Sequence, residues 1–257
     1  MNKTFNANRF GRLFYKHTTE HYKSYLMALS VLAGVMILGG SFLVYMMDFP
    51  IEKSFQTVLF MMFLLLAGTI FTSTIFAELG DRKKAVAWLM LPASAFEKFL
   101  VAWIYSFLAF IVVYSTCFYV VTLFALNIKQ FPGKPPLIFS VFEHHVLLSF
   151  VAYAFLHGFT ICGAVWFEKL HFIKTGFVFF IALALLIFIN KLILDSMLGI
   201  NVEAGPLFSN VRIAGDGGFT DVNITGKQST PYVIYLVAVL AVIFWLSAYY
   251  RLKEKQA

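Results

Sequence analysis

The chain has 257 residues, of which 60% are hydrophobic, 18% aromatic and only 13% charged. Soluble domains carry about 25% charged residues, so this composition excludes an ordinary soluble domain and indicates a membrane protein. A net charge of +7 would also suit a nucleic-acid-binding protein. The basic residues are nevertheless placed as in a membrane protein, and we therefore expect no nucleic-acid partner.

A helix that crosses the hydrocarbon core of a bilayer needs about 20 consecutive apolar residues. Stretches of this kind use most of the chain, so we expect one transmembrane domain over residues 1–257 and no separate soluble domain. The predicted fold class is an all-α polytopic membrane protein with six transmembrane helices. These predicted spans are residues 25–47, 55–77, 99–126, 146–167, 173–194 and 232–250.

The Lys and Arg residues divide unequally between the two sides of these spans. If the N-terminus is cytoplasmic, 14 lie in inner segments, 5 in outer segments and Lys191 within the fifth span, which accounts for all 20. An excess of Lys and Arg near span ends marks the cytoplasmic side. The chain is therefore predicted to be N-in and C-in, in a lipid bilayer that it crosses several times.

Residues 1–24 precede the first span and form an amphipathic pattern. Phe10, Leu13, Phe14 and His17 recur at three- and four-residue spacing, with basic residues on the other faces. This spacing is typical of a helix at the membrane surface. A positively charged flank that only sets the orientation of the first span is the alternative, and the two are compatible.

The cytoplasmic loop 78–98 is basic, then amphipathic, then interrupted by proline. Asp81 can cap a short helix that runs to about Leu91, and Pro92 disfavours helical backbone in the residue before it. Ser94 and Glu97 have the spacing of a capping box that begins the next helix. A tryptophan–leucine face is more than a connecting loop needs. The residues expected to dock on a cytoplasmic partner are Glu78, Arg82, Lys83, Lys84, Trp88, Leu89, Pro92 and Glu97. The alternative is an interfacial segment with Trp88 at the level of the lipid headgroups.

The external loop 195–231 is the longest polar stretch and contains six glycines. Apolar and polar residues alternate in 210–213 and in 220–224, as in short strands.

Motifs of membrane enzymes are missing from the sequence. Both Gly-Lys pairs are followed by the wrong residue for a phosphate-binding loop, Pro135 in one case and Gln228 in the other. We also find neither a zinc-binding His-Glu-x-x-His helix nor a Gly-x-Ser-x-Gly elbow. We therefore expect no enzymatic activity, and no catalytic, cofactor-binding or metal-binding residue.

Two ionisable residues fall inside predicted spans, where such groups are costly and are functional candidates. Lys191 lies four residues before Asp195, and a local ion pair with the lysine reaching outward explains both. His157 lies in the middle of the fourth span. It either lines a pathway or forms a hydrogen bond with a neighbouring helix as a neutral packing residue.

The order of these parts resembles the type-2 permeases of ATP-binding-cassette exporters of bacteria. The shared architecture is a basic amphipathic segment, six spans with both ends inside, a cytoplasmic helix between spans two and three, and a long external loop before the last span. The residues that carry the resemblance are Glu78-Leu79, the run Arg82–Lys84, Leu89-Met90-Leu91-Pro92-Ala93-Ser94 and Glu97-Lys98-Phe99.

The resemblance implies that loop 78–98 is a coupling helix that docks on a separate ATPase subunit. It also implies a second permease copy or a homologous permease, and alternating access along their interface in the bacterial inner membrane. Two other functions remain open from the sequence. One is a non-transporting membrane anchor of a larger complex, and the other is a self-contained channel or secondary transporter.

Overall fold

The structure is a computed structural model. It describes residues 5–47, 51–80, 82–128, 138–167, 170–198, 202–204, 211–215, 218–222 and 230–256. The described part contains six helices that are long and apolar enough to cross a membrane. Each coincides with one of the six predicted spans, which confirms a multi-pass membrane protein. Their bounds are α1 Ala7–Met46, α2 Lys53–Thr74, a continuous helix from Ala95 to Ile128, α6 His144–Trp166, α7 His171–Leu198 and α8 Thr230–Glu254.

The third span is built from three consecutive segments. The α-helix α4 (Ala95–Trp103) passes into one π-helical segment, Ile104–Ala109, which continues as α5 (Phe110–Ile128). Between α2 and α4 lie a 3₁₀ turn, Ala77–Gly80, and the short helix α3 (Arg82–Leu89).

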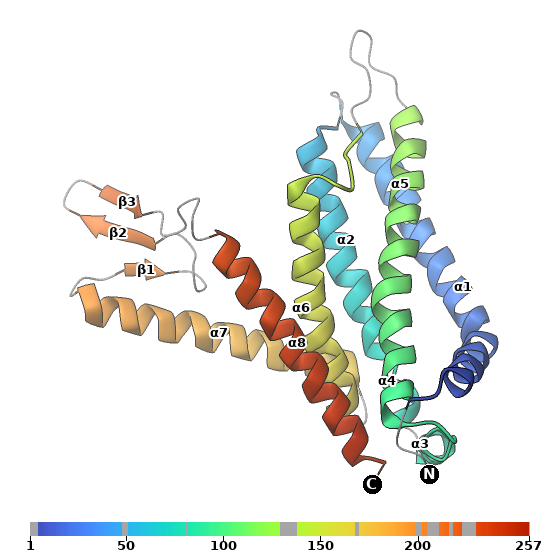
Figure 1. The fold of residues 1–257 in the computed structure, drawn as a ribbon. Helices are drawn as coiled ribbons and strands as arrows, with labels where there is room; N and C mark the ends of the chain where they lie inside the picture. Colours follow the sequence, from blue (N-terminus) through green and yellow to red (C-terminus); the bar gives the residue numbers. More distant parts are fainter. Residues whose placement is uncertain are drawn as a thin grey trace.

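The helices α1, α2, α5 and α6 form a bundle, and α8 crosses in front of α6 (Figure 1). The helix α7 leans away from this bundle. Both ends of the chain lie at the end of the bundle that carries α3. The arrangement puts three parts of the chain on one side of the apolar spans: the N-terminal amphipathic segment, loop 78–98 and the C-terminus. We call the described part of that segment, residues 5–24, the lead-in.

A small antiparallel sheet lies between α7 and α8 along the chain, within an otherwise helical structure. Its strands are β1 Val202–Ala204, β2 Val211–Gly215 and β3 Gly218–Val222, in the order β1-β2-β3. Val202 pairs with Ile213, and Arg212 pairs with Asp221. The alternation noted in the sequence predicted strands in the regions of β2 and β3, whereas residues 223–224 lie outside the described residues.

Aromatic side chains fill the core at the end of the bundle remote from α3. The rings of Phe60 and Phe118 meet edge to face with centroids 5.2 Å apart. The hydroxyl of the buried Tyr114 donates a 2.7 Å hydrogen bond to the Phe60 carbonyl. A second core cluster, nearer to α3, joins Phe76, Phe99, Ile161 and Leu252 among others.

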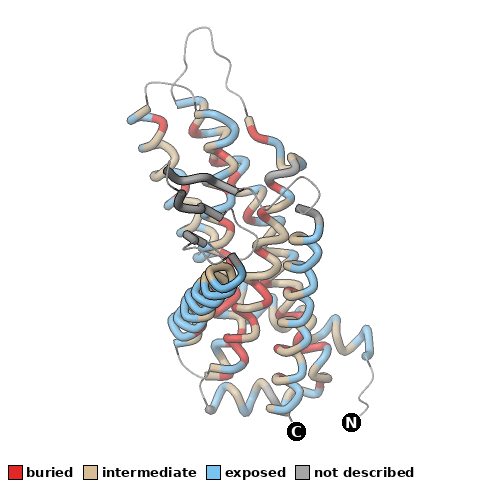
Figure 2. The backbone as a smooth tube through the Cα atoms, turned by 90° about the vertical axis from the view of Figure 1, so that its left-hand side faces the viewer, coloured by how far each residue is buried: buried red, intermediate tan, exposed pale blue. Residues whose placement is uncertain are grey.

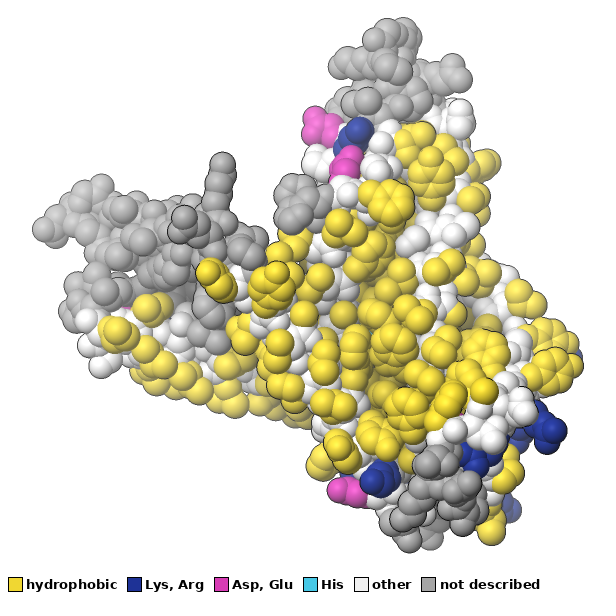
Figure 3. Space-filling view, viewed as in Figure 1, with side chains coloured by type: hydrophobic (Ala, Val, Ile, Leu, Met, Phe, Trp, Pro, Cys, Tyr) yellow, Lys and Arg dark blue, Asp and Glu magenta, His cyan; other side chains and the backbone are white. Residues whose placement is uncertain are grey.

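The outer surface of the bundle is apolar. Buried residues are confined to the sides where helices face one another, and α7 is exposed along much of its length (Figure 2). On the face shown in Figure 3, hydrophobic side chains form a broad band, and charged side chains gather at its two ends. Such a band is the surface expected where lipid surrounds a protein.

Gly68 of α2 lies against the side chain of Tyr153 on α6. A Cβ atom there would lie 2.2 Å from the Cε2 atom of the buried Tyr153. We expect Gly68→Ala to lower the free energy of unfolding by about 1–3 kcal/mol, because the ring has no room to move. Gly34→Ala is the matched control, since a Cβ at Gly34 meets nothing within 4 Å. The check is unfolding of the purified variants in detergent. Equal stability of the two variants would contradict the close packing.

Candidate functional site

The loop 78–98 is ordered by the capping box predicted from the sequence. The Ser94 side chain accepts a hydrogen bond from the Glu97 amide at 3.2 Å, and a Glu97 carboxylate oxygen accepts one from the Ser94 amide at 2.8 Å. Helix α3 ends at Leu89, two residues earlier than expected. The proposed cap, Asp81, lies outside the described residues.

Glu97 is also the anchor of the N-terminal segment. Its buried carboxylate accepts hydrogen bonds from Arg9 Nε and Arg9 Nη2, both at 2.7 Å, and from the Asn6 amide at 2.9 Å. Because Glu97 is fully buried, it serves this contact within the chain and presents no surface to a partner.

The Glu97 carboxylate accepts four hydrogen bonds in all, from the Asn6 and Ser94 amides and from two nitrogens of Arg9. The ion pair with Arg9 is a charge-assisted, bidentate contact of the strong kind.

The predicted amphipathic lead-in is helical, and it continues without a break into the first span as part of α1. Its apolar stripe packs against the chain itself. The ring of Phe14 stacks on Tyr105 with centroids 4.8 Å apart, and the His17 Nε2 atom lies 2.6 Å from the Tyr25 hydroxyl. The hydroxyls of Thr18 and Tyr105 are also hydrogen-bonded to each other.

The lead-in touches both ends of loop 78–98. His21 Nε2 lies 3.4 Å from a carboxylate oxygen of Glu78, where the loop begins. Arg9 holds Glu97, where the loop ends. The loop is thus held between two contacts with one helix, and neither contact was apparent from the sequence, because 57 and 88 positions separate the partners.

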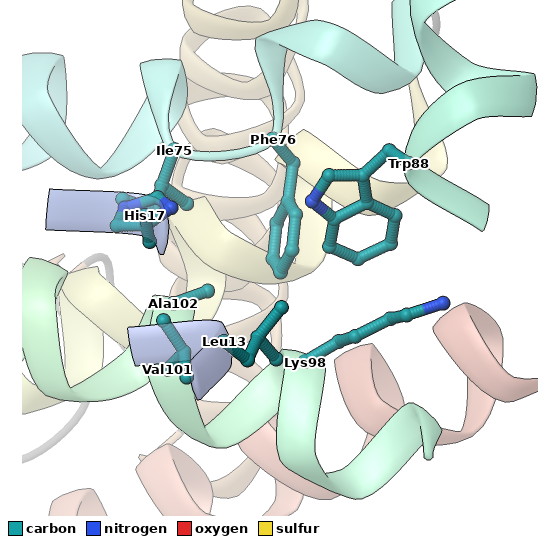
Figure 4. A pocket seen from close by; sticks show the side chains of 8 residues that line it. All are labelled: Leu13, His17, Ile75, Phe76, Trp88, Lys98, Val101 and Ala102. Atoms are coloured by element: carbon teal, nitrogen blue, oxygen red, sulfur yellow. The ribbon is translucent and has the colours of Figure 1, made fainter. Parts of the chain in front are cut away.

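Trp88 faces inward, which was not expected for a docking residue. Its ring meets Phe76 edge to face at 5.9 Å, and the Lys98 Nζ atom lies 5.2 Å from the centre of the Trp88 ring. Figure 4 shows these side chains around a small pocket that Leu13 and His17 of the lead-in also line. Trp88 therefore attaches α3 to the bundle.

The outward face of α3 consists of other residues. Val86 is 56% exposed and Met90, just beyond the helix, is 79% exposed. With the exposed Lys83 and Ala87 they stand at spacings of three and four residues, so they form one continuous stripe. Of the other predicted docking residues, Lys84 and Pro92 are also exposed. The side chains of Arg82 and Leu89 lie outside the described part.

His157 joins three helices through both ring nitrogens. The Trp245 indole N–H donates to Nδ1 at 2.9 Å, so Nδ1 must be unprotonated. Nε2 therefore carries the proton and donates to Ser106 Oγ at 2.8 Å, and Ser106 in turn donates to the Ala102 carbonyl at 2.7 Å. The arrangement matches one of the two interpretations left open by the sequence, a neutral histidine that packs against and hydrogen-bonds to neighbouring helices.

The hydrogen bonds around His157 and Ser106 lie at the π-helical segment of the third span. Tyr153 donates a 2.8 Å hydrogen bond to the Ser106 carbonyl, which lies inside that segment. A π-helical turn displaces backbone carbonyls from the regular α-helical ladder and is frequent at functional sites. Sequence reasoning missed Ser106 and Trp245, since 51 and 88 positions separate them from His157.

Lys191 and Asp195 lie one turn apart on α7, and both are half-buried. Their ion pair remains a prediction. Within the described ranges, no group of three or more His, Cys, Asp or Glu side chains is placed to hold a metal ion.

No protein-family model matches the chain, and neither a curated protein nor a solved structure matches it. The resemblance to type-2 permeases thus rests on the architecture and on the motif residues in loop 78–98.

Proposed function

We propose that this chain is the membrane-spanning permease subunit of an ATP-driven exporter, powered by a separate ATP-binding-cassette ATPase. The observation that carries the proposal is α3. It is a short helix at the end of the bundle with both termini, attached by Trp88 and open to the surroundings along the stripe Lys83, Val86, Ala87 and Met90. Lysine beside exposed apolar side chains suits a protein interface with a polar rim.

The position of α3 also suits the transmission of a movement. One side of the loop is fixed to the lead-in by Arg9–Glu97 and His21–Glu78. The other side continues through α4 into the third span, where the π-helical segment and His157 connect it to α6 and α8. A partner that displaced α3 would therefore act on several spans together.

The proposal includes an N-in, C-in orientation in the bacterial inner membrane, since the 14 to 5 division of basic residues favours it. It also includes a second permease, identical or homologous, across whose interface the cargo would pass. Hydrolysis of ATP is assigned to the partner because this sequence contains no phosphate-binding loop.

Replacing Val86 and Met90 together by Asp tests the docking stripe. The chain would be co-expressed with a candidate ATP-binding-cassette ATPase, and both co-purification and ATP turnover would be measured. We expect the double variant to bind at least about tenfold more weakly, because the two apolar contacts that centre the interface would be lost. The turnover that depends on the chain should fall in parallel.

Tyr15→Ser is the matched control for this experiment. Tyr15 is 71% exposed on the lead-in and lies off α3, so its loss should leave association unchanged. Unchanged binding of the Val86/Met90 variant would argue against the docking role. Binding of the wild-type chain without any effect on ATP turnover would favour the anchor function instead.

A further inference from the structure

Helix α3 is too short to hold its own position. It has eight residues, and isolated helices shorter than about 12–15 residues are marginal in water. Its place at the end of the bundle therefore depends on packing. Among the side chains that the structure describes in α3, Ala85 and Trp88 stand three positions apart and pack against the second core cluster. Alanine contributes little contact area, so most of the attachment falls to the Trp88 ring.

The Trp88 ring contacts two side chains in different ways. Phe76, just after α2, meets it edge to face with ring centroids 5.9 Å apart. The Lys98 Nζ atom lies 5.2 Å from the centre of the ring, and Figure 4 shows the Lys98 side chain extended from α4 toward Trp88. A cation within about 6 Å of an aromatic ring is attracted to its face, and tryptophan is the best such ring.

Burial strengthens the contact between Lys98 and Trp88. Lys98 is only 2% exposed, and a buried charge needs favourable interactions from the groups around it. The Trp88 ring is one of the groups that Lys98 contacts. Attraction between a cation and a ring is weak at exposed sites and grows when water is excluded. The ammonium group and the ring therefore stabilise each other's position.

The first turn of α4 reaches two different elements through consecutive residues. Successive side chains on a helix point about 100° apart. Glu97 binds Arg9 of the lead-in, and Lys98 reaches Trp88 of α3. The capping box of Ser94 fixes the backbone from which both side chains extend. A displacement of α3 would therefore be felt at the start of the third span through Lys98.

We propose that Lys98 is a positioning residue for α3. Its ammonium group, held against the Trp88 ring, keeps that side of the helix inward and the docking stripe outward. Val86 and Met90 present their exposed side chains to a partner only in this orientation. The inference rests on the proposed docking role of α3, and it adds the residue outside α3 that governs how the helix is presented.

Hydrogen exchange of the purified full-length chain in detergent tests the positioning role without a partner. The amides at the end of α3 are the probe, and that of Met90 donates to the Val86 carbonyl at 2.9 Å. Lys98→Met keeps an apolar side chain and removes the charge, so these amides should exchange about tenfold faster. Lys98→Arg keeps a cation that can stack on the ring, and its exchange should stay within about threefold of the wild type.

Two further variants control this measurement. Lys84→Met removes one positive charge from an exposed side chain of α3, and it should change exchange by less than about twofold. Trp88→Leu removes the ring through which Lys98 acts. Adding Lys98→Met to Trp88→Leu should therefore accelerate exchange by less than about twofold more, because both changes remove the same contact.

Association with a candidate ATP-binding-cassette ATPase connects the position of α3 to docking. Lys98→Met should weaken association by about threefold or more, because binding must then also restore the orientation of α3. Gly68→Ala is the control for this measurement. It disturbs packing between α2 and α6 rather than α3, so it should bind the ATPase as the wild type does.

Two results would overturn the proposal. The first is an unchanged exchange rate in Lys98→Met, or equal acceleration by Lys98→Met and Lys98→Arg, since the charge would then not hold the ring. The second is faster exchange with unchanged association. If no ATPase associated even with the wild-type chain, the proposed function would fail, and the exchange measurement would still decide the role of Lys98 by itself.

Discussion

Replacing Glu97 by Ala is expected to destabilise the protein by about 3 kcal/mol and to release the lead-in from loop 78–98. Breaking a buried ion pair typically costs 3–5 kcal/mol, because the remaining groups lose their partner. Arg9 is 25% exposed on its side chain and can turn to water, which favours the lower end of that range. The amides of Asn6 and Ser94 would also lose their acceptor. Unfolding in detergent measures the loss of stability, and protease cleavage before Tyr25 measures release of the lead-in.

Glu20→Ala is the control for Glu97→Ala. Glu20 forms a 3.6 Å ion pair with Lys16 on the same lead-in, but both side chains are about half exposed. Pairs of this kind contribute little to stability, so this variant should unfold like the wild type. If Glu97→Ala behaved in the same way, the lead-in would be held by its aromatic contacts alone.

His157→Ala is expected to lower the free energy of unfolding by about 2–4 kcal/mol. The change leaves a cavity where a fully buried side chain stood, and the Trp245 indole N–H loses its acceptor. Trp245→Phe removes only the donor and should cost about 1 kcal/mol. Unfolding of the two single variants and the double variant measures the coupling, which should be less than additive because they share one hydrogen bond.

Thr116→Val is the control for the His157 variants, since the Thr116 hydroxyl is exposed and donates to the Val112 carbonyl of its own helix. It should change stability by less than about 0.5 kcal/mol. Transport by the isolated chain that was driven by a pH gradient and abolished by His157→Ala would contradict the packing role. It would make His157 a proton carrier and would exclude the exporter proposal.

The spans and one helix start were predictable from the sequence because both depend on neighbours along the chain. A run of about 20 apolar residues must become a helix in lipid, where each backbone polar group needs an internal partner. The capping box needs only Ser94 and Glu97, three positions apart. Local patterns of this kind do not depend on how the helices pack.

The contacts of the site could not be predicted in the same way. Helix α3 is apolar on two sides, so its sequence alone does not tell whether Trp88 or Val86 and Met90 face the bundle. The second partner of Glu97 is Arg9, 88 positions away, and the capping box had already accounted for Glu97. The partners of His157 are equally remote. Long-range pairs such as these are decided by tertiary packing.

The π-helical segment sets the register of the third span. The buried side chains Ala102, Ser106, Tyr114 and Phe118 all stand at multiples of four residues from one another. Along a regular α-helix, each step of four residues advances about 40° past a full turn, so Phe118 would have rotated about 160° away from Ala102. One wider turn between them absorbs part of this rotation. The buried side chains of α4 and α5 therefore lie on one interior face, although a regular α-helix would turn them in different directions. Any change in the π-helical turn would rotate α5 relative to α4.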